Sequence, residues 1–214
     1  MINVAFVGNP NVGKTALINQ ISHASLKIGN WPGVTIEKKE VFFKIGNEDI
    51  KLIDLPGIYN LSINTPEERV SRDFLLNEKV DVIINVMDST SLEKNIYLTA
   101  LLKELGIPIV MALNFEDEFK RIGYKLDIER FQKQLGIPVV FTSGKSGNGV
   151  DKLMEKVVEI SKQTSSEYKQ HRLLFEKEIE SNIETLKNKL KNEKSYEKML
   201  EKYSADWLVI KILE

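Results

Sequence analysis

The sequence predicts an α/β fold, with a doubly wound, mostly parallel sheet that has one antiparallel edge strand, followed by a small all-α part. Over the first 160 residues, short apolar runs alternate with longer segments in which apolar residues recur every three or four positions. Such alternation is typical of a sheet covered by helices on both faces. Residues 165–214 hold ten basic and ten acidic residues, and no glycine or proline follows Gly149. We therefore expect two domains, 1–162 and 163–214.

Six short apolar runs have the length of strands. Four of them are nearly continuous Val, Ile and Leu, which is typical of strands buried on both faces. The second and third are separated by Gly-Asn-Glu-Asp at 46–49, a hairpin signal that makes one edge of the sheet antiparallel. The predicted strands are 2–7, 41–45, 50–55, 80–87, 107–113 and 137–142.

The segments between these strands have helical periodicity. Thr65-Pro66-Glu67-Glu68 forms a capping-box pattern at the start of one helix, and Gly106 is placed to end another. The predicted helices of the first domain are 13–23, 66–77, 92–105, 128–135 and 149–161. Apolar residues spaced by three or four positions predict three more, at 175–190, 196–203 and 207–213.

The composition excludes several classes of site. The chain has 214 residues, no cysteine, two histidines and a net charge of −1. Disulfides, thiolate zinc sites, cysteine nucleophiles and histidine-rich metal sites are therefore excluded, and no iron site is visible. The balanced charge disfavours binding to nucleic acid. No signal peptide and no membrane span is visible, so composition alone predicts a soluble intracellular protein.

A phosphate-binding loop follows the first predicted strand. Residues 8–15 read G-N-P-N-V-G-K-T and match G-x-x-x-x-G-K-[ST] between a strand and a helix. Backbone N–H groups and the helix N-terminus would surround a phosphate, Lys14 would reach the β- and γ-phosphates, and Thr15 would bind Mg²⁺. A glycine-rich turn without ligand is the alternative. The expected nucleotide contacts here are Gly8, Asn9, Pro10, Asn11, Val12, Gly13, Lys14, Thr15 and Ala16.

Two further segments complete the expected phosphate and magnesium site. Asp54-Leu55-Pro56-Gly57 closes the third predicted strand, where the carboxylate of Asp54 would hold Mg²⁺ through water and the Gly57 N–H would meet the γ-phosphate. Thr35, in the loop 29–37, is the natural second hydroxyl for Mg²⁺, although a loop threonine can also be simply solvated. The loop would add contacts from Gly33, Val34, Ile36 and Glu37. We expect Lys14, Thr35 and Gly57 to act in catalysis.

Two loops near the carboxyl ends of the last strands predict guanine as the base. Asn114-Phe115-Glu116-Asp117 follows one strand, and a carboxylate there accepts hydrogen bonds from guanine N1–H and its exocyclic amine, which adenine cannot supply. Thr142-Ser143-Gly144, at the end of the last strand, offers a backbone N–H to guanine O6. Each motif is weak alone, and two polar loops without a ligand are the alternative.

In this order, these motifs resemble the translation-factor-like family of P-loop GTPases. Within that group the chain is similar, over essentially its whole length, to the cytosolic N-terminal part of the FeoB family of bacterial ferrous iron transporters. The resemblance rests on five segments: 8–15, 30–35 (N-W-P-G-V-T), 54–59 (D-L-P-G-I-Y), 67–73 (E-E-R-V-S-R-D) and 92–98 (L-E-K-N-I-Y-L). A sixth, 203–208, resembles the end of that family's helical segment.

The resemblance implies a GTPase that uses GTP, GDP and Mg²⁺, and a helical domain that slows GDP release. It also implies a tethered membrane region at the cytoplasmic face of the bacterial inner membrane. Activation by K⁺ is implied too, with the side-chain oxygen of Asn11 as a ligand and a catalytic contributor. Asn11 has an alternative role as a turn residue with a left-handed backbone. The apolar run 208–213 reaches nearly to the last residue, so we expect the natural chain to continue. Self-association is left open.

Three positions depart from the family pattern. Phe115 stands where lysine or methionine is usual, which keeps an apolar cover for the base but loses the lysine contacts. Gly144 replaces a usual alanine. Ile58 stands where many regulatory GTPases carry a glutamine that orients water, so we expect slow intrinsic hydrolysis and name no general base.

Two other functions compete with this interpretation. Ribosome- or tRNA-associated GTPases of the Era or Der kind share the Gly-Asn-Pro-Asn loop, but the last 50 residues lack the basic excess that RNA binding requires. A non-enzymatic nucleotide-sensing module is the third hypothesis, in which the segment 207–213 is a partner surface.

Overall fold

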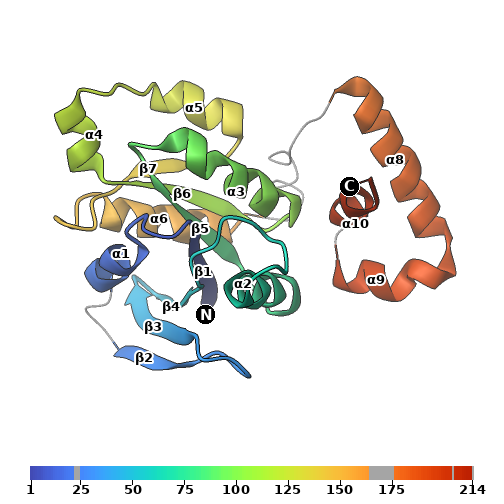
Figure 1. The fold of residues 1–214 in the computed structure, drawn as a ribbon, viewed down its shortest axis with the longest axis horizontal. Coiled ribbons are helices and arrows are strands. Elements are labelled where there is room, and N and C mark those ends of the chain that lie inside the picture. The colour runs from blue at the N-terminus through green and yellow to red at the C-terminus, as the bar shows by residue number, and fades with distance from the viewer. Residues whose placement is uncertain (22–24, 164–175, 204, 214) are drawn as a thin grey trace.

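The protein contains a seven-stranded, mostly parallel sheet with strand order β2-β3-β4-β1-β5-β6-β7 (Figure 1). The computed structural model describes residues 1–21, 25–163, 176–203 and 205–213. β1, β4, β5, β6 and β7 are mutually parallel, which confirms the predicted fold class. The strands are β1 (Ile2–Gly8), β2 (Ser25–Asn30), β3 (Glu37–Ile45), β4 (Glu48–Asp54), β5 (Val82–Asp88), β6 (Ile109–Asn114) and β7 (Val139–Phe141).

The antiparallel edge contains one strand more than the sequence predicts. β3 pairs antiparallel with both β2 and β4, so the strand expected at the edge is second from it. β2 reads S-L-K-I-G-N and Lys27 to Asn30 are exposed, so it lacks the apolar run that marks a strand. The predicted hairpin is confirmed: Ile45 faces Glu48 across a two-residue turn in which Gly46 has φ +58°.

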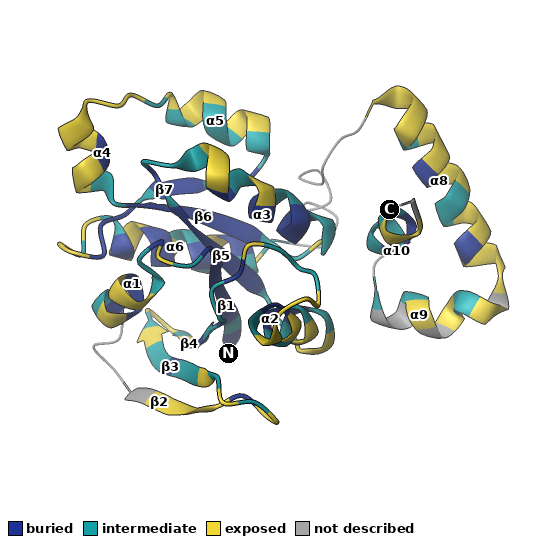
Figure 2. Ribbon diagram, viewed as in Figure 1, coloured by how far each residue is buried: buried dark blue, intermediate teal, exposed yellow. Residues whose placement is uncertain are grey.

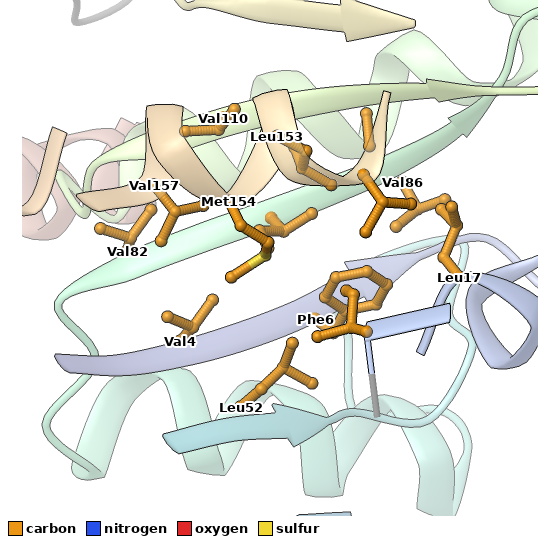
Figure 3. Close-up of a cluster of buried hydrophobic side chains, with 14 of the residues drawn as sticks. Val4, Phe6, Leu17, Leu52, Val82, Val86, Val110, Leu153, Met154 and Val157 are labelled. Carbon is orange, nitrogen blue, oxygen red and sulfur yellow. The ribbon is translucent and has the colours of Figure 1, made fainter. Parts of the chain in front are cut away.

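Helices cover both faces of the sheet. On one face, α1 (Lys14–Ile21) and α6 (Val150–Ser161) pack on the strands. Figure 3 shows Leu153, Met154 and Val157 of α6 against side chains of β1, β4, β5 and β6. The other face packs against α2 (Pro66–Asn77), α3 (Leu92–Glu104) and α5 (Ile128–Leu135). The central strands are buried, as Figure 2 shows.

The structure differs from the sequence prediction at the start of α2 and at α4. The Thr65 hydroxyl accepts from the Glu68 N–H at 3.1 Å, as predicted. The Glu68 carboxylate accepts from the Ser62 hydroxyl at 2.6 Å, and this contact is not the reciprocal half of a capping box. The sequence analysis missed α4 (Glu116–Ile122), because charged residues dominate it and only Phe119 is buried.

The C-terminal helices form a separate small cluster. They are α8 (Lys177–Asn192), the 3₁₀ turn η2 (Lys194–Tyr196), α9 (Glu197–Lys202) and α10 (Ala205–Leu213). Ile183 and Leu190 of α8 pack against Leu208 and Val209 of α10. The predicted onset at 175 lies outside the described residues, and the domain boundary after 162 stays a prediction.

α10 also contacts the first domain. It lies between α8 and α3 in Figure 1. The Lys211 ammonium is 3.2 Å from the Glu104 carboxylate at the end of α3. In the described part of the chain, no helix combines the length and apolar character that crossing a membrane requires.

Candidate nucleotide-binding site

The phosphate loop joins β1 to α1 in the geometry that its motif predicts. β1 ends at Gly8 and α1 begins at Lys14. A Cβ atom at Gly8 would overlap the carbonyl of Val86 in β5, and one at Gly13 would overlap the side-chain amide of Asn114. Gly13 also has φ +81°, a left-handed conformation that favours glycine. Neither position can hold a larger residue, because neighbouring groups approach both glycines closely.

The two asparagines of the loop have different environments. Asn9 is buried, and its Nδ2 donates to the Lys94 carbonyl in the first turn of α3 at 3.2 Å. Asn11 is exposed, has φ +65°, and has no hydrogen-bond partner among the described residues. Its backbone fits the turn-residue alternative, and its free side chain is compatible with a ligand.

Lys14 and Asp54 contact each other. The Lys14 ammonium lies 3.3 Å from Asp54 Oδ1 and donates to the Leu55 carbonyl at 2.7 Å. Burial raises the pKa of Asp54, and the positive charge of Lys14 opposes that rise. The lysine therefore occupies the space between the phosphate loop and the carboxylate predicted to hold Mg²⁺.

The segment after Asp54 is fixed to the phosphate loop. The Ile58 N–H donates to the Gly8 carbonyl at 3.1 Å, and the side chain of Ile58 is buried. Gly57 approaches Pro10 so closely that an added Cβ would lie 3.1 Å from the Pro10 Cα atom. The Gly57 backbone thus lies beside the loop that would hold the phosphates.

Thr35 lies in the turn between β2 and β3. It is exposed, in a turn closed by the Trp31 N–H donating to the Ile36 carbonyl at 2.9 Å. The buried ring of Trp31 packs edge-on against Phe74 of α2, with ring centroids 5.3 Å apart. Among the described residues, no hydrogen bond joins Thr35 to Lys14, Thr15 or Asp54. Trp31 anchors the turn, a role that the sequence analysis missed.

The two base-binding loops are joined through one side chain. Asn114 is fully buried; its Nδ2 donates to the Val12 carbonyl at 2.9 Å and its Oδ1 accepts from the Gly144 N–H at 2.9 Å. The Glu116 N–H donates to the Thr142 carbonyl at 3.0 Å. The structure therefore brings together the phosphate loop, the segment 114–117 and the segment 142–144.

Phe115 and Asp117 differ in their surroundings. Phe115 has φ +66°, and its ring lies against the phosphate loop, 3.1 Å from where a Cβ of Gly13 would stand. Asp117 is exposed in the first turn of α4. An aromatic wall and an accessible carboxylate are the features that the guanine prediction requires.

The family model for ferrous iron transport protein B matches residues 2–157. The chain belongs to this family. Relatives include the Fe(2+) transport protein A/Fe(2+) transporter FeoB fusion protein of Porphyromonas gingivalis, 42% identical over 187 residues, which are 87% of this chain and 22% of the relative. The Fe(2+) transporter FeoB of Helicobacter pylori is 42% identical over 168 residues, 77% of this chain and 26% of the relative. The chain thus spans about a quarter of these relatives' length.

Solved FeoB structures share the fold over the whole chain. The cytosolic domain of the T. maritima FeoB iron transporter in apo form has a TM-score of 0.87 and 38% identity, covering 100% of this chain and 81% of that one. The same domain in its GMPPNP form has a TM-score of 0.87 and 37% identity, with the same coverage. These matches favour the FeoB family over the Era- or Der-like alternative.

Proposed function

We propose that this chain binds GTP and GDP with Mg²⁺, hydrolyses GTP slowly, and is the K⁺-activated regulatory domain of a bacterial ferrous iron transporter. The observation that carries the proposal is the side chain of Asn114, which ties the phosphate loop to the loop predicted to meet guanine O6. Membership of the FeoB family and structures of relatives in GDP and GMPPNP forms support it.

The residues of the chain would have different roles in binding and hydrolysing the nucleotide. Lys14 would leave Asp54 and Leu55 to neutralise the β- and γ-phosphates, while the N–H groups of the phosphate loop and of Gly57 hold their oxygens. Phe115 would cover the base and Asp117 would accept its two N–H donors. Ile58 is apolar and its N–H is already bonded to Gly8, so hydrolysis would proceed without a side chain that orients water.

The residues fit Mg²⁺ once Lys14 has moved. Asp54 is a largely buried carboxylate whose pKa burial raises, and Thr15 is exposed at the start of α1, so a hard cation would find the Thr15 hydroxyl as a ligand and the Asp54 carboxylate as a partner through water. Thr35 would supply the second hydroxyl. Bound Mg²⁺ would supply charge neutralisation at the phosphates, and K⁺ held by Asn11 would supply a second positive charge.

Nucleotide affinity tests the proposal. We expect the purified chain to bind GDP and GTP with Mg²⁺ far more tightly than ATP in equilibrium dialysis or calorimetry. Tight ATP binding without GTP binding would overturn it. Turnover in a K⁺ buffer separates a GTPase from a nucleotide-sensing module, because only the former releases phosphate.

Base selection has its own test. Asp117→Asn replaces an acceptor with a group that matches xanthine, so affinity for GDP should fall by roughly 30- to 1,000-fold, as expected for losing a charged pair of hydrogen bonds. Xanthosine diphosphate should recover the affinity. Unchanged GDP affinity would refute the role of Asp117.

Membership of the family also supports a proposal for the location of the whole protein. We propose that a membrane region of the longer natural chain places this domain at the cytoplasmic face of the inner membrane. Cell fractionation of the full-length protein would report the membrane association, and blue-native electrophoresis with and without GTP would report any homo-oligomer.

A further inference from the structure

A cavity of 340 Å³ lies where the first domain meets α10. Asn60 and Ser62, in the segment that follows Asp54-Leu55-Pro56-Gly57, form one rim, and Trp207 of α10 forms the other. Between them, Leu76 of α2 and Leu101 of α3 provide an apolar lining. The cavity is separate from the nucleotide site, since neither the phosphate loop nor the two base loops line it.

The charges on its walls do not balance. Lys211 is paired with Glu104 at 3.2 Å, and the Glu104 side chain is only 9% exposed. Arg72 of α2 is half-buried, and within the described residues its guanidinium has no ion pair and no hydrogen bond. Within the described part of the chain, Arg72 therefore lines the cavity as a basic side chain without an anionic partner. A half-buried guanidinium keeps its charge at any physiological pH, so its desolvation is offset only by an anion or by water.

We propose that this cavity binds a small molecule with one anionic group, a carboxylate or a phosphate monoester, on an apolar or aromatic body. Arg72 supplies the planar donor pair that such oxyanions match. The leucine side chains and the faces of Tyr97 and Trp207 suit the apolar body. The volume falls in the range of small-ligand pockets, about 300–1,000 Å³.

Such a ligand would contact the first domain and α10 at once. The walls of the cavity come from α2, α3 and the segment 60–62 on one side and from α10 on the other. An occupied cavity would therefore hold the two parts together. Holding the two parts together predicts slower GDP release, and this consequence rests on the proposed function. Binding of the anion does not depend on the proposed function.

Binding can be measured with defined probes. The chain is titrated with 3-phenylpropanoate, phenyl phosphate and the neutral analogue 3-phenylpropan-1-ol, with and without saturating GDP, by ligand-observed NMR. At least one anion should bind at least about tenfold more tightly than the alcohol. Arg72→Gln should remove that preference. Arg121→Gln, which changes an exposed arginine of α4 outside the cavity, is the matched control and should keep it.

A second variant keeps the test decisive if Arg72→Gln unfolds. Leu76→Trp fills the cavity and leaves the arginine in place, so it should abolish binding of the anions. The proposal is overturned if neither anion binds below 10 mM, on the order of the weakest useful fragment, if the alcohol binds equally well, or if both cavity variants bind normally. Anion binding with an unchanged GDP release rate would keep the site and remove its regulatory role.

Discussion

Asn114 and Gly144 are joined by a buried hydrogen bond, in which the Gly144 N–H donates to Asn114 Oδ1 at 2.9 Å. The other end of the same side chain donates to the Val12 carbonyl at 2.9 Å. One residue therefore holds the phosphate loop and the last base loop at a fixed separation. This link exists in the protein itself, so the nucleotide would enter a site whose two halves are already aligned.

Asn114→Ala should disrupt both halves of the site. The change leaves the Val12 carbonyl and the Gly144 N–H buried without their partner, which costs about 1–3 kcal/mol for each group. We expect the free energy of unfolding to fall by about 2–6 kcal/mol and GDP affinity to fall with it. Urea denaturation and calorimetry measure the two effects.

The control is Asn148→Ala in the neighbouring loop. The Asn148 side chain donates to Glu116, but that contact is exposed. Its loss should change stability by less than about 0.5 kcal/mol. If the two variants were equally stable, the bridging role assigned to Asn114 would be wrong.

Gly144 brings its loop unusually close to α1. A Cβ at position 144 would lie 2.8 Å from the Cβ of Ala16, which is backbone-fixed and cannot turn away. Gly144→Ala should therefore cost about 1–3 kcal/mol of stability by overpacking. In the double variant with Ala16→Gly, the shortest of these contacts is removed, so the two changes should couple by more than about 1 kcal/mol in a double-mutant cycle. If the stability effects of the two substitutions simply added, the loop of Gly144 would be free to move away from α1.

Trp31 should report whether the turn 31–36 moves. Thr35 is exposed in this turn, and the turn is held by the packing of Trp31 on Phe74. In a Trp207→Phe background, which leaves Trp31 as the single tryptophan, GMPPNP with Mg²⁺ should red-shift the emission as the ring leaves its buried place. GDP should cause no such shift. A spectrum identical in both nucleotides would argue that Thr35 is not a ligand.

The sheet was predictable where burial alone selects the residues. β1, β5 and β6 are buried over nearly their whole lengths, so their sequences are apolar throughout and the pattern is unambiguous. β2 is stabilised by pairing with β3 along an exposed edge, which leaves no apolar signature. α4 also lacks an apolar signature, because it is short and charged and Phe119 is its buried residue.

The sequence predicts which residues belong to the site, but it does not predict which of them contact each other. Spacing identified Lys14, Asp54, Asn114 and Gly144, because glycines, carboxylates and amides at strand ends have specific chemistry. It could not show that Asn114 bridges two loops, since that depends on how far apart β1 and β6 lie. The distance of Thr35 from the phosphate loop depends on the packing of Trp31, which no motif records.

Asn11 has two possible roles that one substitution can separate. Its φ of +65° suits asparagine and glycine, so Asn11→Gly keeps the backbone conformation and removes the side chain with its oxygen. If that oxygen holds K⁺, the variant should lose the difference between GTPase rates in K⁺ and in Na⁺ while GDP affinity stays within about threefold. Persistent K⁺ stimulation in Asn11→Gly, or equal rates in the unaltered protein, would leave Asn11 as a turn residue alone.

Lys103 should make the stability of the protein depend on pH. Its ammonium, on α3, is buried and donates to the Leu135 carbonyl at the end of α5 at 2.5 Å. Burial lowers the pKa of Lys103 below its ordinary 10.5. The unfolded chain then binds more protons than the folded one as the pH approaches 10.5, so the free energy of unfolding gains a contribution that rises with pH.

Lys103→Met should remove this contribution. The variant loses the donor to Leu135, which costs about 1–3 kcal/mol at neutral pH. Compared with it, the unaltered protein should gain stability from pH 8 to pH 10 with a slope of at most about 1.4 kcal/mol per pH unit, because one proton is involved. Lys152→Met, which changes an exposed lysine of α6, should run parallel to the unaltered protein. Urea unfolding at each pH measures all three curves, and a constant difference between the unaltered protein and Lys103→Met would show that the buried ammonium keeps its ordinary pKa.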